Sequence, residues 1–462
     1  MCGIAGILNW SSRQADGDLP QLLGQMSDRL AHRGPDDAGQ WVEPTTGTGF
    51  AHRRLSIIDL SAQGRQPFVD AEGRHVLVLN GEIYNYLELR EELRAKGVEF
   101  RTATDTEVLL EALKLWGRDA LDRLDGMFAF AFHDVAARRT LLARDRFGEK
   151  PLYWAQIGHA LVFASELVAL SGLPGFDGRV DSDAVAEYLY LQYLDSPHAI
   201  HRSARKLPPG SWMLVEGGQI RSSGRYFAFR PSEEKRVWNA DALADELEDI
   251  LVRSLRRRLL SDVPTGAFLS GGVDSALVAA LICKKLGRPL QTFTLGFAGT
   301  PHSEHHQARA TATHLGCDHH EKLLAPAALT EFSTVAGALD EPNADTSCLP
   351  VYHLAAFART GITVALSGDG ADELFAGYSR YGRMLTAATH DTSYGEPGRA
   401  YYSQHLQVWG EAQFMPALHD RPDGFLQQRD ALFAEIDSSP LSLCDRLRMA
   451  DVNHYMPGSV LA

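Results

Sequence analysis

Residues 270–275 read Ser-Gly-Gly-Val-Asp-Ser and stand between an apolar run that ends at Leu269 and a helical pattern that begins at Ser275. Gly271 and Gly272 allow the backbone to approach a phosphate closely, and successive N–H groups with a helix N-terminus form an anion cradle. The hydroxyl groups of Ser270 and Ser275 add donors. Because the carboxylate of Asp274 repels a bare phosphate, Mg²⁺ is expected between the two. A glycine turn capped by Ser or Asp is the alternative interpretation.

A second loop of similar character spans residues 367–373, after an apolar strand predicted at 362–366. It carries Ser367 and Gly368, then the acidic residues Asp369, Asp372 and Glu373. Ligands of open α/β sheets collect outside the carboxyl ends of the strands, so both loops should lie at one edge. Asp274 and Asp372 are then predicted to share one Mg²⁺. A helix start that complements the macrodipole is the alternative interpretation of Asp372.

Strands and helices alternate around these loops. An amphipathic helix is predicted over 243–259, a strand at 292–297 and a helix that ends at Leu315. This alternation predicts a parallel sheet with right-handed crossovers, and therefore an α/β domain of Rossmann-like type.

The first half of the chain has a different pattern. Buried strands are predicted at 4–8, 75–79, 127–132 and 140–143. One helix begins at Tyr86 and ends before Gly97, and another begins after Asp105 and stops at Gly117. These elements predict an α+β domain of layered sheets and helices. A polar stretch without periodicity, which contains Pro231, suggests domains at 1–225 and 239–462 joined by a linker at 226–238.

Charge and composition exclude several classes of protein. The formal net charge is −14, and the one dense basic stretch, 253–258, falls on the solvated face of a helical pattern, so a nucleic-acid partner is not expected. The five cysteines have neither metal-ligand nor disulfide-framework spacing. The longest apolar run, 276–283, is far short of a membrane span, and the N-terminus does not resemble a signal peptide. A reducing cytoplasm fits best.

Cys2 becomes the first residue of the chain if Met1 is removed. A thiol and a free α-amine would then share one residue, with unperturbed pKa values of about 8.5 and about 8. A nucleophile and a weak base in one residue need no separate histidine. An ordinary start to a buried strand is the alternative for an isolated Met-Cys-Gly.

The chain resembles the glutamine-dependent asparagine synthetases of the class II amidotransferase type over nearly its whole length. In the first half the matching strings are 2–6, 32–36, 54–57, 80–85, 125–128, 144–148 and 163–166. In the second half they are the two loops with 262–264, 294–297, 340–342 and 374–378. The resemblance implies a four-layer N-terminal-nucleophile sandwich followed by an ATP-pyrophosphatase domain. It is also compatible with a homodimer.

Roles follow by resemblance at the matching positions. Cys2 would attack the glutamine side-chain amide, and Asn80 with the Gly81 N–H would form the oxyanion hole. Arg54 would hold the α-carboxylate, while Glu82 and Asp105 would hold the α-ammonium. Taken alone, Asp105 suits a helix N-cap and Asn80-Gly81 suits a hairpin turn.

The second domain would bind ATP through a set of loop residues, adenylate a carboxylate substrate and release pyrophosphate. The set comprises Leu269, Ser270, Gly271, Gly272, Asp274, Ser275, Ser367 and Gly368. Ammonia would pass between the two sites through a dry tunnel at the domain interface. Aspartate is the default acceptor and asparagine the product. One alternative is that the acceptor is another carboxylate, such as an antibiotic precursor or a surface-sugar uronic acid. A second alternative is that the chain is a glutaminase with a degenerate nucleotide-binding module that has a regulatory role. The phosphate loop disfavours a glucosamine-forming or phosphoribosylamine-forming amidotransferase.

Three departures from the family pattern stand out. Asp369 stands where the family has Glu, a position that helps to deprotonate ammonia. The segment 302–304 differs, and its nearby histidines have no standard ligand spacing. The sequence stops at Ala462, short of a family segment that carries a phosphate-contacting lysine, so we expect the chain to be a fragment.

Overall fold

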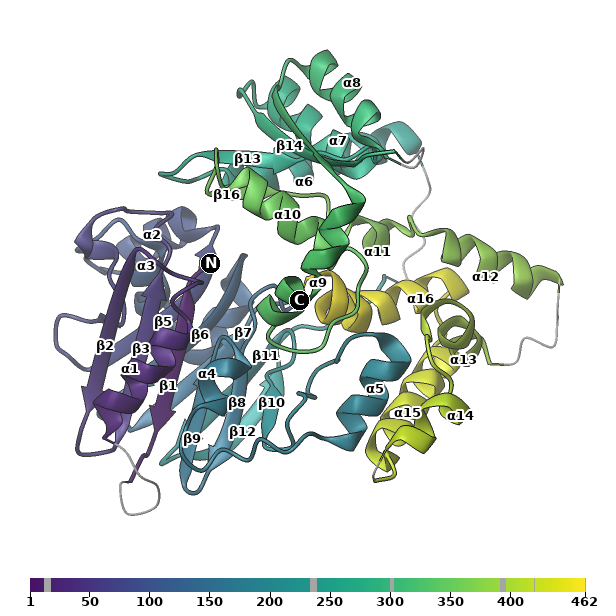
Figure 1. Ribbon diagram of the computed structural model, residues 1–462. Helices are drawn as coiled ribbons and strands as arrows, with labels where there is room; N and C mark the ends of the chain where they lie inside the picture. Colours follow the sequence, from purple (N-terminus) through teal and green to yellow (C-terminus); the bar gives the residue numbers. More distant parts are fainter. Residues whose placement is uncertain (12–17, 233–238, 300–302, 391–395, 419, 462) are drawn as a thin grey trace. The chain divides into compact units, whose positions relative to one another are not determined.

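The computed structural model describes residues 1–462 except 12–17, 233–238, 300–302, 391–395, 419 and 462 (Figure 1). The chain forms two compact units. The first contains Met1–Pro231, Asp340–Asn343 and Tyr378–Ala462, and the second contains Ser232–Leu339 and Ala344–Gly377. The domain boundaries at residues 225 and 239 remain predictions from the sequence. Residues 233–238 of the predicted linker lie outside the described residues.

Two six-stranded antiparallel sheets form the centre of the first unit. The first sheet has the order β10 (Ala204–Lys206), β8 (Tyr153–Ile157), β9 (Ala160–Ala164), β1 (Gly3–Leu8), β3 (Thr48–Arg54) and β2 (Asp37–Glu43). The second has the order β12 (Gln219–Arg225), β11 (Ser211–Glu216), β7 (Arg139–Arg144), β6 (Gly126–Asp134), β5 (His75–Ile83) and β4 (Phe68–Val69). All four strands predicted for this half are therefore present.

Alternation along the strands produces four layers. Ile4 and Leu8 of β1 pack with Val76 and Val78 of β5 between the two sheets. The intervening Ala5 and Ile7 face α1 (Leu19–Arg29) and α4 (Leu167–Ser171). On the other side, Leu77 and Leu79 pack against α2 (Tyr86–Ala95) and α3 (Asp105–Trp116). The predicted four-layer sandwich is confirmed: successive residues of the central strands point to opposite faces, and each face is covered by the other sheet or by helices.

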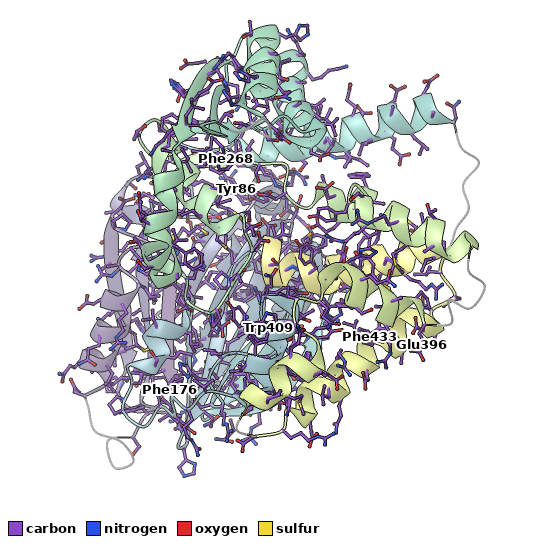
Figure 2. All side chains as sticks on the ribbon, turned by 45° about the vertical axis from the view of Figure 1, so that its right-hand side comes forward. Tyr86, Phe176, Phe268, Glu396, Trp409 and Phe433 are labelled. Atoms are coloured by element: carbon purple, nitrogen blue, oxygen red, sulfur yellow. The ribbon has the colours of Figure 1, made fainter. Side chains whose placement is uncertain are left out.

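A group of helices after Tyr378 completes the first unit, together with α5 (Ser182–Leu191). It contains α12 (Ser379–His390), α13 (Pro397–Tyr401), α14 (Glu411–Phe414), α15 (Asp423–Ser438), α16 (Leu443–Ala450) and the π-helix η7 (Asp451–Val460). Asp451 is fully buried and accepts hydrogen bonds from Arg380 at 2.8 Å and Tyr401 at 2.6 Å. Phe433, which Figure 2 labels, packs against Tyr402 with ring centroids 5.4 Å apart.

The second unit contains the predicted parallel sheet. Its order is β15 (Asp318–Leu324), β14 (Gln291–Phe297), β13 (Thr265–Phe268) and β16 (Val364–Leu366). The helices are α6 (Ala240–Arg258), α7 (Val273–Ala280), α8 (His305–Leu315), α9 (Phe332–Ala338), α10 (Cys348–Ala358) and α11 (Ala371–Phe375). Residues of α6, α7 and α8 cover one face of the sheet, and α10 covers the other. Strand β15 was not predicted, because its polar and charged residues do not show the apolar run or the alternation that is typical of a strand.

Two local features differ from the expectations. Helix α7 begins at Val273 rather than Ser275, because Gly272 is its N-cap. The basic stretch 253–258 forms the end of α6, where cations complement the helix dipole. No helix among the described residues combines the length and the apolar character that crossing a bilayer requires.

Asp145 is a buried carboxylate that holds the turn after β7. It is 1% exposed and accepts hydrogen bonds from the N–H groups of Phe128, Phe147, Glu149 and Lys150 at 2.9–3.2 Å. Replacing Asp145 by Ala leaves four buried donors without their acceptor. We expect the free energy of unfolding to fall by about 3 kcal/mol in urea titrations followed by circular dichroism. Asp119, whose side chain is 78% exposed, changed to Ala, is the control and should leave the midpoint unchanged; an equal shift in both variants contradicts the prediction.

Candidate active site

A small cavity in the first unit brings together the residues predicted for a glutaminase. It has a volume of about 60 Å³. Its lining includes Cys2, Arg54, Asn80, Gly81, Glu82 and Asp105, together with Met1, Gly64 and Lys150. All six predicted residues therefore meet, although they come from two strands, one helix and the residue before β1, in different parts of the chain.

Cys2 lies directly before β1, which pairs with β3 on one edge and β9 on the other. Because Gly3 is opposite Arg53, the register places Cys2 next to Arg54. The Cys2 thiol is 3.7 Å from the carbonyl oxygen of Leu55. Burial raises the pKa of this thiol, and the charge of Asp105 raises it further, whereas Arg54 acts in the opposite direction.

Arg54 is almost fully buried, and backbone carbonyls hold its guanidinium. One nitrogen, Nη1, donates to Ser61 at 2.9 Å, and Nη2 donates to Ile58 at 3.3 Å and to Asp59. A Cβ atom on Gly64 would lie only 1.9 Å from Nη2 of Arg54. The absence of a side chain at Gly64 is therefore required for the position of the guanidinium.

Asn80 and Gly81 lie inside β5, which extends to Ile83, and not in a hairpin turn. Asn80 is fully buried, and neither its Oδ1 nor its Nδ2 has a hydrogen-bond partner in the structure. A buried amide without a partner is costly, and such a group inside a cavity beside a thiol is arranged to bind a ligand atom. Gly81 has φ 151°, and a Cβ there would lie 2.0 Å from the carbonyl oxygen of Met127.

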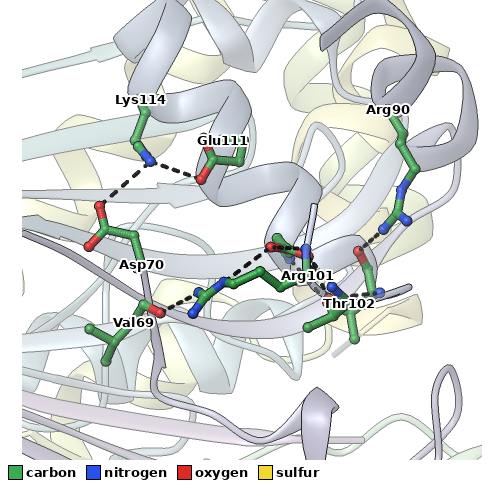
Figure 3. A network of polar contacts seen from close by, with 9 residues as sticks. Val69, Asp70, Arg90, Arg101, Thr102, Glu111 and Lys114 are labelled. Carbon is green, nitrogen blue, oxygen red and sulfur yellow. Dashed lines mark hydrogen bonds and ion pairs between the residues drawn. The ribbon is translucent and has the colours of Figure 1, made fainter. Parts of the chain in front are cut away.

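Asp105 is the first residue of α3, and Thr104 is the N-cap. The alternative interpretation of Asp105 as the cap is therefore wrong. Figure 3 shows the polar network around this helix start: Arg90 donates to the Thr104 carbonyl at 3.1 Å, and the Thr102 N–H donates to Glu107 at 2.7 Å. Because Thr104 caps the helix, the Asp105 carboxylate is directed to the cavity, where it accepts the Ile83 N–H at 2.9 Å.

Figure 3 also shows contacts that connect α3 and Arg101 to the segment at residues 69–70. Lys114 of α3 lies 2.9 Å from Glu111 and 3.6 Å from Asp70, and Arg101 donates to the carbonyl of Val69 at 2.9 Å. The helix that presents Asp105 is thus held at several points. Burial raises the pKa of Asp105, so an anion at this position requires a nearby cation.

Met1 and Lys150 are lining residues to which the sequence predicted no binding role. The Lys150 ammonium lies 3.3 Å from the Met1 sulfur, and Nη2 of Arg33 lies 3.8 Å from it. Burial lowers the pKa of Lys150. Local sequence carries no signal for Lys150, because its burial depends on the turn that Asp145 holds.

A second, larger cavity lies at the carboxyl ends of the strands in the second unit. It has a volume of about 450 Å³ and is lined by residues of both predicted loops: Leu269, Ser270, Ser275, Ser367, Gly368 and Asp369. Thr294, Glu304 and Val351 also line it. The hydroxyl of Ser367 donates to Asp369 at 2.7 Å.

The two loops touch each other, as predicted from their strands. A Cβ on Gly368 would lie 3.0 Å from Cβ of Asp274 and 3.0 Å from the Ser275 nitrogen. Strands β13 and β16 are direct neighbours, which explains the contact. A side chain at position 368 would therefore require Asp274 or its neighbour to shift by a few tenths of an ångström.

Glu304 is a charged residue of this cavity to which the sequence predicted no role. Its carboxylate accepts the N–H of Gly271 at 3.2 Å, so an acidic side chain stands at the mouth of the expected anion cradle. An acidic residue before a helix is indistinguishable in sequence from one that complements the macrodipole. Among the described residues, no group of three or more His, Cys, Asp or Glu gathers as a metal site, and His302 lies outside them.

The charges around Cys2 make its reactivity dependent on Asp105. Changing Asp105 to Asn removes an anion that raises the thiol pKa, while an acceptor for the Ile83 N–H remains. A lower pKa gives more thiolate at a given pH, so the pH midpoint of Cys2 alkylation by iodoacetamide should move down. Peptide mass spectrometry resolves Cys2 from the other cysteines. Exchanging the exposed Glu91, which does not line the cavity, for Gln provides a comparison, and an unchanged or raised midpoint in Asp105→Asn contradicts the prediction.

Comparison with known proteins matches both halves of the chain to known families. Residues 1–227 match the glutamine amidotransferase domain family, and residues 246–462 match the asparagine synthase family. The glutamine-hydrolysing asparagine synthetase 1 of Bacillus subtilis is 37% identical over 389 residues, which cover 84% of this chain and 60% of that protein. A provisionally named glutamine-hydrolysing asparagine synthetase 2 of Methanocaldococcus jannaschii is 32% identical, with 82% and 76% covered. The chain spans about three fifths of the length of several of these relatives. It belongs to the family of glutamine-hydrolysing asparagine synthetases.

Proposed function

We propose that the chain supplies the glutaminase and the nucleotide-binding parts of an amide synthetase. Glutamine, ATP and a carboxylate, by default aspartate, give glutamate, AMP, pyrophosphate and the amide. The observation that carries the proposal is the buried amide of Asn80, which stands unpartnered in the cavity beside Cys2. A glutamine carbonyl that becomes an oxyanion would supply the partner that Asn80 lacks.

The first half-reaction uses the residues of the small cavity. After removal of Met1, the Cys2 thiol loses its proton to its own α-amine, directly or through water, and the sulfur attacks the side-chain amide carbon of glutamine. Asn80 and the Gly81 N–H stabilise the oxyanion, and one such donor is worth about 3 kcal/mol in the transition state. Ammonia leaves, and water then hydrolyses the thioester to glutamate.

Arg54, Glu82 and Asp105 orient the amino-acid end of glutamine in this proposal. The guanidinium of Arg54 is already fixed by carbonyl groups, so little side-chain entropy is lost when it binds a carboxylate. The ammonium of glutamine supplies the cation that the buried Asp105 lacks. Removal of Met1 would free the space beside Lys150 that its side chain now fills.

The second half-reaction is assigned to the larger cavity. The loop 270–275 would hold the phosphates of ATP at the start of α7, and pyrophosphate would leave as the carboxylate substrate is adenylated. Asp274 and Asp372 would hold Mg²⁺, and the bound ion would supply positive charge that offsets the repulsion between these carboxylates and the phosphates. Asp369 would accept a proton from ammonia as the nitrogen attacks the acyl group.

Two variants separate the two half-reactions. Cys2→Ala removes the nucleophile, so glutamine hydrolysis should fall to background while synthesis with added ammonia persists. Asp274→Asn should abolish pyrophosphate release and leave hydrolysis of glutamine intact. Glutamate and pyrophosphate are measured by coupled assays, and loss of both activities in Cys2→Ala contradicts the two-site scheme.

The identity of the acceptor is tested by product analysis. Detection of asparagine by mass spectrometry after incubation with aspartate supports aspartate as the acceptor, whereas an amide of another carboxylate identifies the alternative reaction.

Gly64 provides a test of the role of Arg54. In Gly64→Ala, the new Cβ displaces the guanidinium, so the KM for glutamine should rise by about tenfold or more with a smaller change in kcat. Gly178→Ala is the matched control, because a Cβ there meets no atom within 4 Å. Steady-state kinetics measure both parameters. An unchanged KM in Gly64→Ala shows that Arg54 does not hold the substrate.

A further inference from the structure

Several strings that marked the family resemblance have no role in the proposed reaction, and three of these are 32–36, 163–166 and 340–342. The structure joins one residue from each. Nε of Arg33 donates to the carbonyl oxygen of Cys2 at 2.9 Å, and Nη1 of Arg33 lies 2.6 Å from Glu166. The side chains of Arg33 and Glu166 are only 8% and 12% exposed, so this ion pair is largely shielded from water. Arg33 thus restrains the backbone of the predicted nucleophile, and Glu166 restrains Arg33.

Glu166 occupies the N-cap position of α4, yet its side chain makes no capping hydrogen bond. Asp340 supplies the missing cap from a segment that is 173 residues further along the chain. Its Oδ2 accepts the N–H of Leu167, and its Oδ1 accepts the N–H of Val168 at 2.9 Å. These donors would otherwise lack a partner within the helix, and an acidic side chain is the preferred acceptor at a helix start.

The neighbouring residues hold the same segment in place. Glu341 accepts the Ile200 N–H at 2.7 Å and the Tyr153 hydroxyl at 2.9 Å, and it lies 2.7 Å from the Lys206 ammonium. Ser165 is hydrogen-bonded to both backbone groups of Ile4, two residues after Cys2, at 2.9 Å each. The turn at 165–168 therefore contacts the beginning of β1 on one side and Asp340 on the other.

We propose that Asp340 is a positioning residue for the nucleophile Cys2, acting through Glu166 and Arg33. By capping α4, Asp340 leaves the Glu166 carboxylate available to Arg33. Without Asp340, the N–H groups of Leu167 and Val168 compete with Arg33 for the Glu166 carboxylate, which stands at the ordinary capping position. Arg33 then loses its anion, and the carbonyl of Cys2 loses a fixed donor. This role rests on the proposed glutaminase function.

The test compares two adjacent acidic residues in the complete chain. Asp340→Ala should lower kcat for glutamine hydrolysis by about tenfold or more and leave KM within about twofold, because Arg54 and Asp105 are not touched. Asp340→Asn keeps one acceptor oxygen and should give an intermediate kcat. Glu341→Gln is the matched control: it weakens a buried ion pair in the same segment, and the contacts described for Glu341 are with Tyr153, Ile200 and Lys206 and not with α4. We therefore expect kcat to change by less than about twofold.

A double-mutant cycle tests the path itself. In a Glu166→Gln background, Asp340→Ala should reduce kcat by less than about a further twofold. Additive losses, or equal losses in Asp340→Ala and Glu341→Gln, overturn the proposal, because they indicate general loosening of the segment.

The rate of Cys2 alkylation by iodoacetamide gives a readout that needs no turnover. Asp340→Asn should raise this rate by about threefold or more, since the start of β1 opens more often, and Glu341→Gln should not. An unchanged rate in Asp340→Asn overturns the proposal. If the chain with its native sequence hydrolyses no glutamine, the proposed function fails, while the alkylation rates still decide the role of Asp340.

Discussion

Strand β1 is hydrogen-bonded on both edges, to β3 and to β9, and the position of Cys2 depends on this pairing. All six residues of β1 are buried, and Gly6 has no room for a side chain because a Cβ there would lie 2.3 Å from Phe163. A one-residue slip would turn the apolar residues Ile4 and Leu8 away from the facing sheet, so the register is strongly specified. Since Cys2 directly precedes this strand, its thiol is placed by the core and not by a loop.

Burial has an electrostatic consequence for the small cavity. A thiol, a carboxylate and an ammonium group share it, and burial disfavours the charged form of each, as the raised pKa values of Cys2 and Asp105 and the lowered pKa of Lys150 show. The free energy of desolvating these groups is already included in the free energy of folding, so it does not have to be supplied when a ligand binds. A zwitterionic ligand with the charges of glutamine would then restore a partner to Asp105 without a further rearrangement of solvent.

Local patterns in the sequence were sufficient for much of this fold. The alternating strands of the first half, the phosphate loop and the meeting of the two loops were all predicted, because each depends on residues that are close in sequence or on a general rule for parallel sheets. The length of β5 and the capping role of Thr104 were not, since the pairing with β6 and the contacts of Glu107 decide them. Asp340 could not be assigned from local sequence either, because its partners lie 172 and 173 residues away.

Asp369 lines the second cavity, and in the proposed reaction it would accept the proton of ammonia. Asp369 replaces the glutamate of the family pattern, so its carboxylate is withdrawn by about one C–C bond, roughly 1.5 Å. The hydroxyl of Ser367 holds that carboxylate at 2.7 Å, and Gly368 is packed against Asp274, so the loop has little freedom to move forward. Misplacement by about 1 Å can cost a hundredfold in rate. In the proposed reaction, the position of Asp369 would therefore restrict where the acyl carbon of the acceptor can lie.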